Sequence, residues 1–494
     1  MSGPPDTAAF VGEQDSRLSN ADLDPVPPDR RRWRWGSFAV LWVSLSACIP
    51  TYLLASSLIQ GGMNWREAIL TIFLGNLIVL VPMVLNAHAG TRYGIPFPVF
   101  CRAAFGIRGA NVPALLRALV ACGWFGIQTA IGGNALYQIL LVFLPGLASG
   151  RSLPVLGISL CQFACFLLFW AVNMAVVYRG IESIRLLLSI KAPLLIAMGL
   201  ALLAWAYRHA GGFGLILSQP SAFGPGQPKH GQFLPYFLLS LTGMIGFWAT
   251  LSLNIPDFSR YAASQRDQIV GQAVGLPLTM ALFAFIGVAV TAATTIIYGH
   301  PIWDPIEVVS RFRNPAVLVA AMLAICVATL ATNIAANVVS PANDFAHLAP
   351  RRITFRVGGL ITGLIGIAMM PWKLLADPSG YIFTWLVGYS ALLGPIGGIL
   401  IADYVVHRRG RLSLRALYRS DGEYRYLGGV SRVALVALTV AVLPSLPGFL
   451  VQVQAIRGTG LPAFLLGIYD YAWFAGFGLA FAVYLLLRRL APRG

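Results

Sequence analysis

A short interruption in the first apolar run of the chain decides how its fold is read. Residues 44–51 read Ser-Leu-Ser-Ala-Cys-Ile-Pro-Thr, which places small residues before Pro50 inside a stretch long enough to cross a membrane. Proline lacks a backbone N–H donor and its ring clashes with the preceding helical turn. Unwound backbone at membrane depth is tolerated only where it is buried in protein or lines a cavity. The stretch therefore predicts a broken membrane-spanning helix.

The sixth apolar run carries a similar interruption. Residues 242–250 read Thr-Gly-Met-Ile-Gly-Phe-Trp-Ala-Thr, and Pro256 and Asp257 follow. Spans one and six correspond if the first ten spans form two five-helix repeats of opposite topology, and broken spans at corresponding positions indicate a transporter binding site. The alternative is that Pro50 and Pro256 are ordinary kinks, because proline and glycine are common in membrane helices.

The composition of the whole chain indicates a membrane protein. Of its 494 residues, 57% are hydrophobic and 11% are charged, whereas soluble domains carry about 25% charged residues. A spanning helix needs ~20 mostly apolar residues. Such runs centre on residues 37–60, 68–87, 112–145, 153–177, 185–207, 233–257, 270–298, 316–341, 357–372, 381–406, 430–452 and 463–487. We therefore expect an all-α polytopic membrane protein with twelve transmembrane helices.

The basic residues predict the orientation in the membrane. The net charge is +17, but the arginines lie between the apolar runs and not in one patch, so we expect no nucleic acid partner. Cytoplasmic loops of membrane proteins collect Lys and Arg. With the N-terminus inside, the inner segments carry 27 of the 35 Lys and Arg residues and the outer segments carry 8. We expect both termini on the cytoplasmic side of the cell (inner) membrane.

Ionisable groups are nearly absent from the centres of the predicted spans. Asp257, Asp344 and Asp403 fall at inner ends, and no acid or base is expected near a midplane. A charge there would be costly and would mark a proton relay or a charged-substrate site. The pattern therefore argues against a strongly charged substrate and against an enzyme, which would need an acid–base or nucleophile set. The six cysteines form no CxxC pair, so no metal site or disulfide framework is expected.

Uncharged polar and aromatic side chains are concentrated in three spans. Trp124 and Gln128 lie at i, i+4 on one helix face, as do Asn333 and Asn337, and Trp248 lies beside the second break. Amides offer donors and an acceptor, and indoles can stack on a ring. Together they predict a site for a planar molecule with an amide-like edge. The alternative is that the amides only hold helices together.

Seven short motifs resemble those of the nucleobase–cation symporter-1 family, in the family's order. They are residues 48–52 (Cys-Ile-Pro-Thr-Tyr), 90–99, 105–109, 122–128, 332–343, 369–372 and 394–404. The allantoin, hydantoin and uracil permeases are the branch that the chain resembles.

The resemblance implies a LeuT-like fold of two inverted five-helix repeats. The repeats would cover residues 37–207 and 233–406. A basic cytoplasmic loop (407–429) and two additional transmembrane helices (430–487) would follow. Residues 1–36 are polar and rich in Pro and Asp, so from their composition we expect a disordered cytoplasmic tail without a cleavable signal peptide.

The resemblance also implies the substrate site. A ring would stack between the two indoles, with the amides bonding its edge and Leu386 as the outer gate. The implied substrate-binding residues are Cys48, Trp124, Gln128, Phe247, Trp248, Asn333 and Asn337. A hydantoin-type relative has Gln in place of Cys48, so the substrate preference of this chain can differ.

The implied cation site consists of backbone carbonyls matching Ser44, Ala47 and Ala328, together with two adjacent hydroxyls. Here the hydroxyl positions are Ala331 and Thr332, so one oxygen ligand is missing and a sodium site would be weak. Sodium coupling, proton coupling and uncoupled transport all stay open, and no other cofactor is expected.

These observations predict a secondary active transporter, a cation symporter that imports a planar uncharged heterocycle such as allantoin, a hydantoin or uracil by alternating access. A sodium-independent proton symporter or a passive facilitator for a related nucleobase is the alternative. The expected partners are the substrate and the lipid bilayer, and the chain is expected to function as a monomer.

Overall fold

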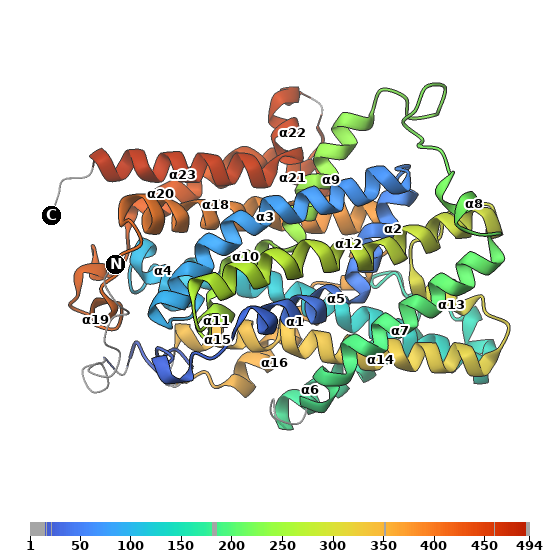
Figure 1. The fold of residues 1–494 in the computed structure, drawn as a ribbon, viewed down its shortest axis with the longest axis horizontal. Coiled ribbons are helices and arrows are strands. Elements are labelled where there is room, and N and C mark those ends of the chain that lie inside the picture. Colours follow the sequence, from blue (N-terminus) through green and yellow to red (C-terminus); the bar gives the residue numbers. More distant parts are fainter. Residues whose placement is uncertain are drawn as a thin grey trace.

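The computed structural model describes residues 15–490, apart from residues 16, 21, 180–184, 350–351 and 459. Within these residues the protein is built from helices, with three isolated β-bridges and no strand. Most of the long helices run along one direction (Figure 1). The all-α prediction is confirmed.

The helices follow one another in two sets and a C-terminal group. The first set is α1 (Trp35–Ser46), α2 (Ile49–Gln60), α3 (Trp65–Tyr93), α4 (Phe97–Phe105), α5 (Asn111–Phe143), α6 (Leu160–Arg179), α7 (Arg185–His209) and α8 (Phe213–Leu217). The second set is α9 (Phe233–Phe247), α10 (Ala249–Asn254), α11 (Pro256–Ser259), α12 (Gln265–Tyr298), α13 (Pro305–Ser310), α14 (Pro315–Asn337), α15 (Val339–Leu348), α16 (Phe355–Ala368), α17 (Pro371–Leu374), the π-helical η5 (Gly380–Leu386), α18 (Val387–Ile401) and η6 (Ala402–His407). The C-terminal group is α19 (Leu414–Leu417), α20 (Arg432–Val442), α21 (Leu446–Gln452), α22 (Ala463–Asp470) and α23 (Ala472–Leu490).

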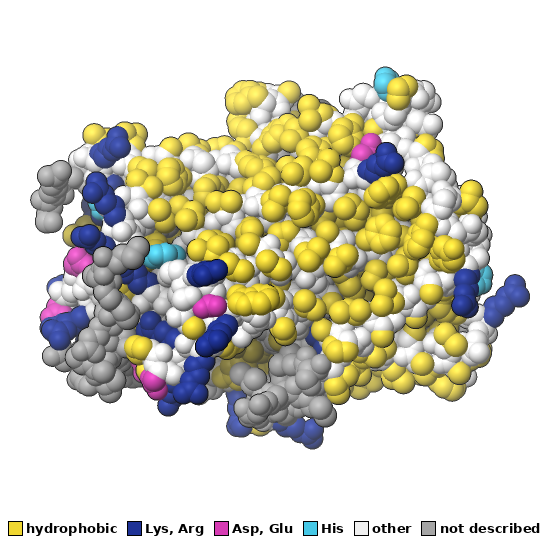
Figure 2. All heavy atoms as spheres, viewed as in Figure 1, with side chains coloured by type: hydrophobic (Ala, Val, Ile, Leu, Met, Phe, Trp, Pro, Cys, Tyr) yellow, Lys and Arg dark blue, Asp and Glu magenta, His cyan; other side chains and the backbone are white. Residues whose placement is uncertain are grey.

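Many of these helices are long and apolar enough to cross a membrane. Among the described residues nine helical stretches meet that standard, and the bent pair α1–α2 makes a tenth. The two other expected spans are represented by the shorter apolar helices α9 and α16, so the count of twelve stays a prediction. Hydrophobic side chains cover the middle of the molecule, and Lys and Arg gather toward its ends (Figure 2). The chain is a multi-pass membrane protein.

Both predicted breaks are present. Helix α1 ends at Ser46, α2 begins at Ile49, and the two are bent by 61°. Helix α9 ends at Phe247, Trp248 has φ −101° and ψ 3°, and α10 begins at the next residue. Pro256 starts the one-turn helix α11, where its missing donor is tolerated. The chain is therefore interrupted at corresponding places in its two halves.

Three predicted span boundaries are wrong, each for a local reason. The fourth span begins at Leu160 and not at residue 153, because Pro154 and Gly157 (φ +78°) lie in a loop. The ninth ends at Ala368, since Met370 takes a left-handed conformation (φ 46°) before α17. The last run is divided between α22 and α23.

The prediction of a disordered tail over residues 1–36 is wrong for its described part; residues 1–14, 16 and 21 lie outside the described residues. Leu23 and Val26 are buried, and the Tyr418 hydroxyl donates to the Leu23 carbonyl at 2.6 Å. Arg31 Nε donates to the Val26 carbonyl at 2.8 Å. The described part of the segment is therefore held by hydrogen bonds and has buried apolar side chains.

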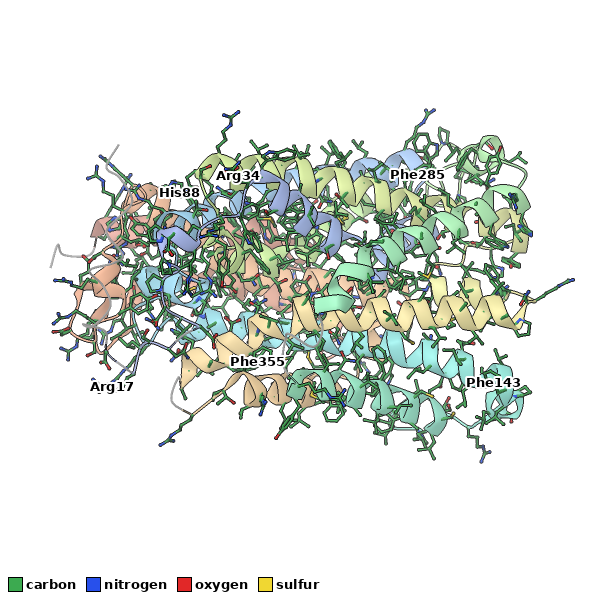
Figure 3. The ribbon with its side chains drawn as sticks, turned by 60° about the horizontal axis from the view of Figure 1, so that its bottom comes forward. Arg17, Arg34, His88, Phe143, Phe285 and Phe355 are labelled. Carbon is green, nitrogen blue, oxygen red and sulfur yellow. The ribbon has the colours of Figure 1, made fainter. Side chains whose placement is uncertain are left out.

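Helix α5 lies at the centre of the arrangement. It packs against α6, α14 and α16, while α12 packs against α1, α2 and α3. Gly126 allows α5 to approach α16, because a Cβ there would lie 2.6 Å from the carbonyl oxygen of Gly366. In Figure 3, Arg17 and His88 lie toward one end of the molecule and Phe143 toward the other. The two breaks and the middle of α5 are thus brought together deep inside the protein.

Candidate binding site between the broken helices

The two breaks, α5 and α14 enclose a small cavity of about 50 Å³. Each element contributes side chains from its middle, and the Trp, Gln, Asn and Cys side chains of the lining are buried. The lining residues are Leu45, Cys48, Pro50, Trp124, Gln128, Phe247, Trp248, Thr250, Leu251, Thr332, Ala336 and Asn337. Six of the seven substrate-binding residues that the sequence suggested therefore share one cavity. Asn333 does not line it.

Aromatic rings form one side of the cavity. The Phe247 ring contacts both indoles edge-to-face, with centroids 5.4 Å from Trp124 and 4.8 Å from Trp248. Behind them, Trp42 lies 5.1 Å from Trp248 and Trp385 lies 6.0 Å from Trp124. Edge-to-face contacts of this kind fix the orientation of each ring. The indoles are held in place by neighbouring rings, several of which the sequence analysis did not single out.

Two of the lining residues carry a buried hydrogen-bonding atom without a partner among the described residues. These atoms are Gln128 Oε1 and Trp248 Nε1. Leaving a buried polar atom unpaired costs about 1–3 kcal/mol. One atom is an acceptor and the other a donor, so the pair complements a ligand that carries both an N–H and a C=O group.

Asn333 bonds to other helices, whereas Asn337, one turn further along α14, lines the cavity. Its amide nitrogen donates to Asn173 Oδ1 at 3.1 Å and to the Phe125 carbonyl at 3.2 Å. Its Oδ1 accepts from Asn337 Nδ2 at 3.1 Å. Asn333 is fully buried. It ties α14 to α5 and α6 and orients Asn337, which does line the cavity.

Leu386, the expected outer gate, lies at the end of η5 and is fully buried. Its backbone packs against α9 at Gly246, where a Cβ would come within 2.6 Å of the Leu386 carbonyl oxygen. It is not a lining residue of the cavity. The gating role stays a prediction.

The expected cation ligands are partly engaged by protein donors. Thr332 Oγ1 donates to the Ala328 carbonyl at 2.8 Å, and Lys191 Nζ donates to the Ser44 carbonyl at 2.5 Å. Ala47 lies at the break itself, and Ala331 offers no side-chain oxygen. The residues present do not fit a sodium ion, because an ammonium group occupies one carbonyl and a hydroxyl is missing.

Lys191 is a buried base within a predicted span, near the start of α7 and not at its middle. In the sequence it follows Arg179 and Arg185, which are expected at the inner end of this span. The signal was a lone lysine inside the apolar run 185–207.

A polar network closes the structure on the side of the chain termini. Arg117 Nη1 lies 2.8 Å from Asp344 Oδ2, and both side chains are buried. Ser340 Oγ donates to Asp257 Oδ2 at 2.8 Å and lies 2.7 Å from the amide of Asn254. The network joins α5, α10, α11 and α15 below the cavity.

A second, larger cavity of about 190 Å³ lies on the opposite side. Its lining includes Leu53, Asn134, Trp303, Asp304 and Trp372. Asp304 Oδ1 accepts from the Ile306 N–H at 2.8 Å and caps α13. Burial raises the pKa of the Asp304 carboxyl to about 6.

A helical membrane protein in which two broken spans meet at a buried cavity has the architecture of a secondary transporter. Residues 25–476 match the model of a family described as permeases for cytosine/purines, uracil, thiamine and allantoin. The chain belongs to this family, and it is a transporter and not an enzyme.

Named relatives and a solved structure agree with this assignment. The chain is 46% identical to the purine-uracil permease NCS1 of Arabidopsis thaliana, over 97% of this chain and 79% of that protein. It is 41% identical to the allantoin permease of Bacillus subtilis, over 97% and 95%. It is 26% identical, with a TM-score of 0.75, to Mhp1, a nucleobase-cation-symport-1 family transporter solved in a closed conformation with bromovinylhydantoin bound; 96% of each chain is covered. The LeuT-like inverted-repeat fold is thereby confirmed.

Proposed function

We propose that this transporter imports a planar, uncharged heterocycle such as allantoin, a hydantoin or uracil by alternating access. The observation that carries the proposal is the unpaired donor and acceptor, Trp248 Nε1 and Gln128 Oε1, in a buried cavity bounded by indoles. A ring with an amide edge satisfies both atoms. The names of the relatives support the substrate class.

In the proposed site the ring lies against Trp124 and Trp248, with Phe247 and Cys48 completing the wall. Gln128 and Asn337 bond the polar edge, and Asn333 positions Asn337. Leu386 closes the outer side. The network around Arg117 and Asp344 closes the inner side until the substrate is released.

Ligand-induced quenching of tryptophan fluorescence in detergent tests the substrate class. The panel is allantoin, hydantoins, uracil, cytosine and purines. We expect saturable quenching by at least one ring with an amide edge, and its loss in Trp124→Ala. Trp473→Phe is the matched control, because Trp473 lies on α23, outside the two repeats. No binding by any member of the panel would contradict the proposal.

Coupling is proposed as cation symport, with sodium-independent proton symport or passive facilitation as the second candidate. The missing hydroxyl at Ala331 argues against sodium as the coupled cation. Uptake into proteoliposomes separates them: accumulation above the outside concentration requires coupling, and collapse of that accumulation by a protonophore assigns the proton. Uptake that only equilibrates indicates a facilitator.

We further propose that the chain works as a monomer in the inner membrane with both termini in the cytoplasm. The uneven distribution of basic residues supports this orientation. Cysteines engineered at exposed positions test it as a pair: Asp29→Cys on the tail and Arg66→Cys at the start of α3. Impermeable reagent applied to intact cells should label the second and spare the first.

A further inference from the structure

Lys191 is a buried cation at the first break. The chain has three lysines, at positions 191, 229 and 373, and only Lys191 lies within an apolar run expected to span the membrane. Its side chain is fully buried, and Nζ donates to the carbonyl of Ser44 in the last turn of α1. Burying an ammonium group is costly unless it is well paired. A lysine kept at this place therefore needs an explanation.

The carbonyl that Lys191 contacts gives that explanation. Carbonyls in the last turn of a helix lack intrahelical partners, and Ser44 O is one of those that the family resemblance assigned to a coupling cation. A second carbonyl of that implied cation site is also engaged, since Thr332 Oγ1 donates to Ala328 O. The hydroxyl that would complete a sodium shell is absent at Ala331. A sodium ion would meet a positive charge and an incomplete set of oxygens.

We propose that the Lys191 ammonium takes the place of the coupling sodium ion, so that the closed state and heterocycle binding are independent of sodium. The ammonium holds the broken end of α1 to α7 permanently, where a bound ion would hold it only transiently. This inference takes the identity of the heterocycle from the proposed function, whereas its statement about sodium does not depend on that function. Its consequence is that Ala331→Ser alone does not create sodium dependence.

The experiment measures melting temperatures of the purified full-length protein without heterocycle, in sodium chloride and in choline chloride of equal concentration. An ion that binds only the folded state stabilises it in proportion to ln(1 + [ion]/Kd). Wild type and Ala331→Ser should show no sodium-specific rise. The double variant Lys191→Ala with Ala331→Ser should show one, because it frees the Ser44 carbonyl and restores the hydroxyl.

Two controls separate charge from cavity space. Lys191→Arg with Ala331→Ser keeps the positive charge and should stay insensitive to sodium. Lys229→Ala with Ala331→Ser removes a lysine that donates to the Gly61 carbonyl at 2.6 Å outside the spans, and it should also stay insensitive. A sodium-specific rise in wild type overturns the proposal even if the Lys191 variants do not fold. So does a well-folded double variant that does not respond.

Heterocycle binding provides the second readout. In wild type the dissociation constant should be the same in sodium and in choline. In the responsive double variant, sodium should lower it by roughly 5- to 150-fold, the usual range of coupling between two sites. Absence of heterocycle binding in both media would contradict the proposed function and leave the melting-temperature result to decide the role of Lys191.

Discussion

The two broken spans differ in the group that meets their free carbonyls. At the first break the Ser44 carbonyl accepts from the ammonium of Lys191, on α7. At the second break the Gly246 carbonyl accepts from the hydroxyl of Tyr389, on α18, at 2.7 Å. Helices α7 and α18 are the fifth helices of the two repeats, so each of these two bonds is made within one repeat. A charged side chain thus donates to a carbonyl at the first break, and an uncharged side chain donates to a carbonyl at the second.

This difference indicates a division of tasks. The second break presents Phe247 and Trp248 to the cavity, and its backbone partner is neutral. The first break bends by 61° and holds the buried charge. We therefore expect changes near the second break and α5 to alter heterocycle recognition, and changes around Lys191 to alter the response to ions.

The largest expected effect is at Trp124, which contacts Phe247 of the second break. Trp124→Ala should abolish measurable binding, while Trp124→Phe should retain part of it. Stacking on one ring face is worth ~1–3 kcal/mol, or roughly five- to 150-fold in affinity, by analogy with base–aromatic stacks. The affinity of each variant is measured by calorimetry or by ligand-induced quenching of the fluorescence of the remaining tryptophans. A folded Trp124→Ala protein that binds like wild type would remove the second break from substrate recognition.

The next effect concerns the polar edge. Gln128→Leu and Asn337→Leu should each weaken the binding of heterocycles with an amide edge by about 1–3 kcal/mol, which is the cost of an unpaired buried polar group. Aromatic ligands without that edge should lose much less. Asn173→Leu is the comparison, because Asn173 contacts Asn333 and not the cavity. Equal losses across all ligands would mean that the substitutions act on folding.

A smaller effect is expected for the neutral bond at the second break. Tyr389→Phe removes the donor to Gly246 O and should lower affinity by about fivefold, since a neutral hydrogen bond contributes about 1 kcal/mol. The effect should be the same with and without sodium. Tyr381→Phe, which removes a 3.1 Å bond to the Pro50 carbonyl, gives the matched measurement at the first break. A sodium dependence that appears only in Tyr389→Phe would mean that the second break, and not the first, determines the response to ions.

The smallest effect lies away from both breaks, at Asp304. Burial raises the pKa of this carboxyl to about 6 in the folded protein, so the folded state binds the proton more tightly than the unfolded chain does. Its contribution to stability is therefore greatest at low pH and is lost as the pH rises through about 6. Asp304→Asn keeps the cap on α13 and should flatten the fall in melting temperature between about pH 4 and about pH 6. An unchanged pH profile would contradict this assignment.

The sequence predicted the parts of the structure that depend on local chemistry. Pro50 and the small residues before it locate the first break, and the i, i+4 spacing of Trp124 and Gln128 places both on the face that lines the cavity. The same spacing failed to separate Asn333 from Asn337. The Asn333 amide nitrogen donates to Asn173 on α6. A contact between helices that are distant in the sequence leaves no periodic pattern in either segment.

Lys191 could not be placed from the sequence for the same reason. A lysine near the start of a span usually extends to the membrane surface, and only the packing of α7 against α14 and α12 shows that this one is enclosed. The ordered tail was missed because Leu23 and Val26 are isolated apolar residues in a polar segment. Their burial depends on the distant loop that carries Tyr418.

That tail has a practical consequence for anyone who shortens the protein. Trp33 donates its backbone N–H to the Tyr261 carbonyl and accepts from the N–H of Ala263, both at 2.8 Å. Arg31 Nη1 lies 3.3 Å from the Arg92 carbonyl at the end of α3. One segment is thus fastened to the end of α3 in the first repeat and to the connection between α11 and α12 in the second. A truncation that starts at Trp35 removes these contacts and keeps every residue that lines the cavity, so we expect it to change the rate of transport and not the affinity for the heterocycle.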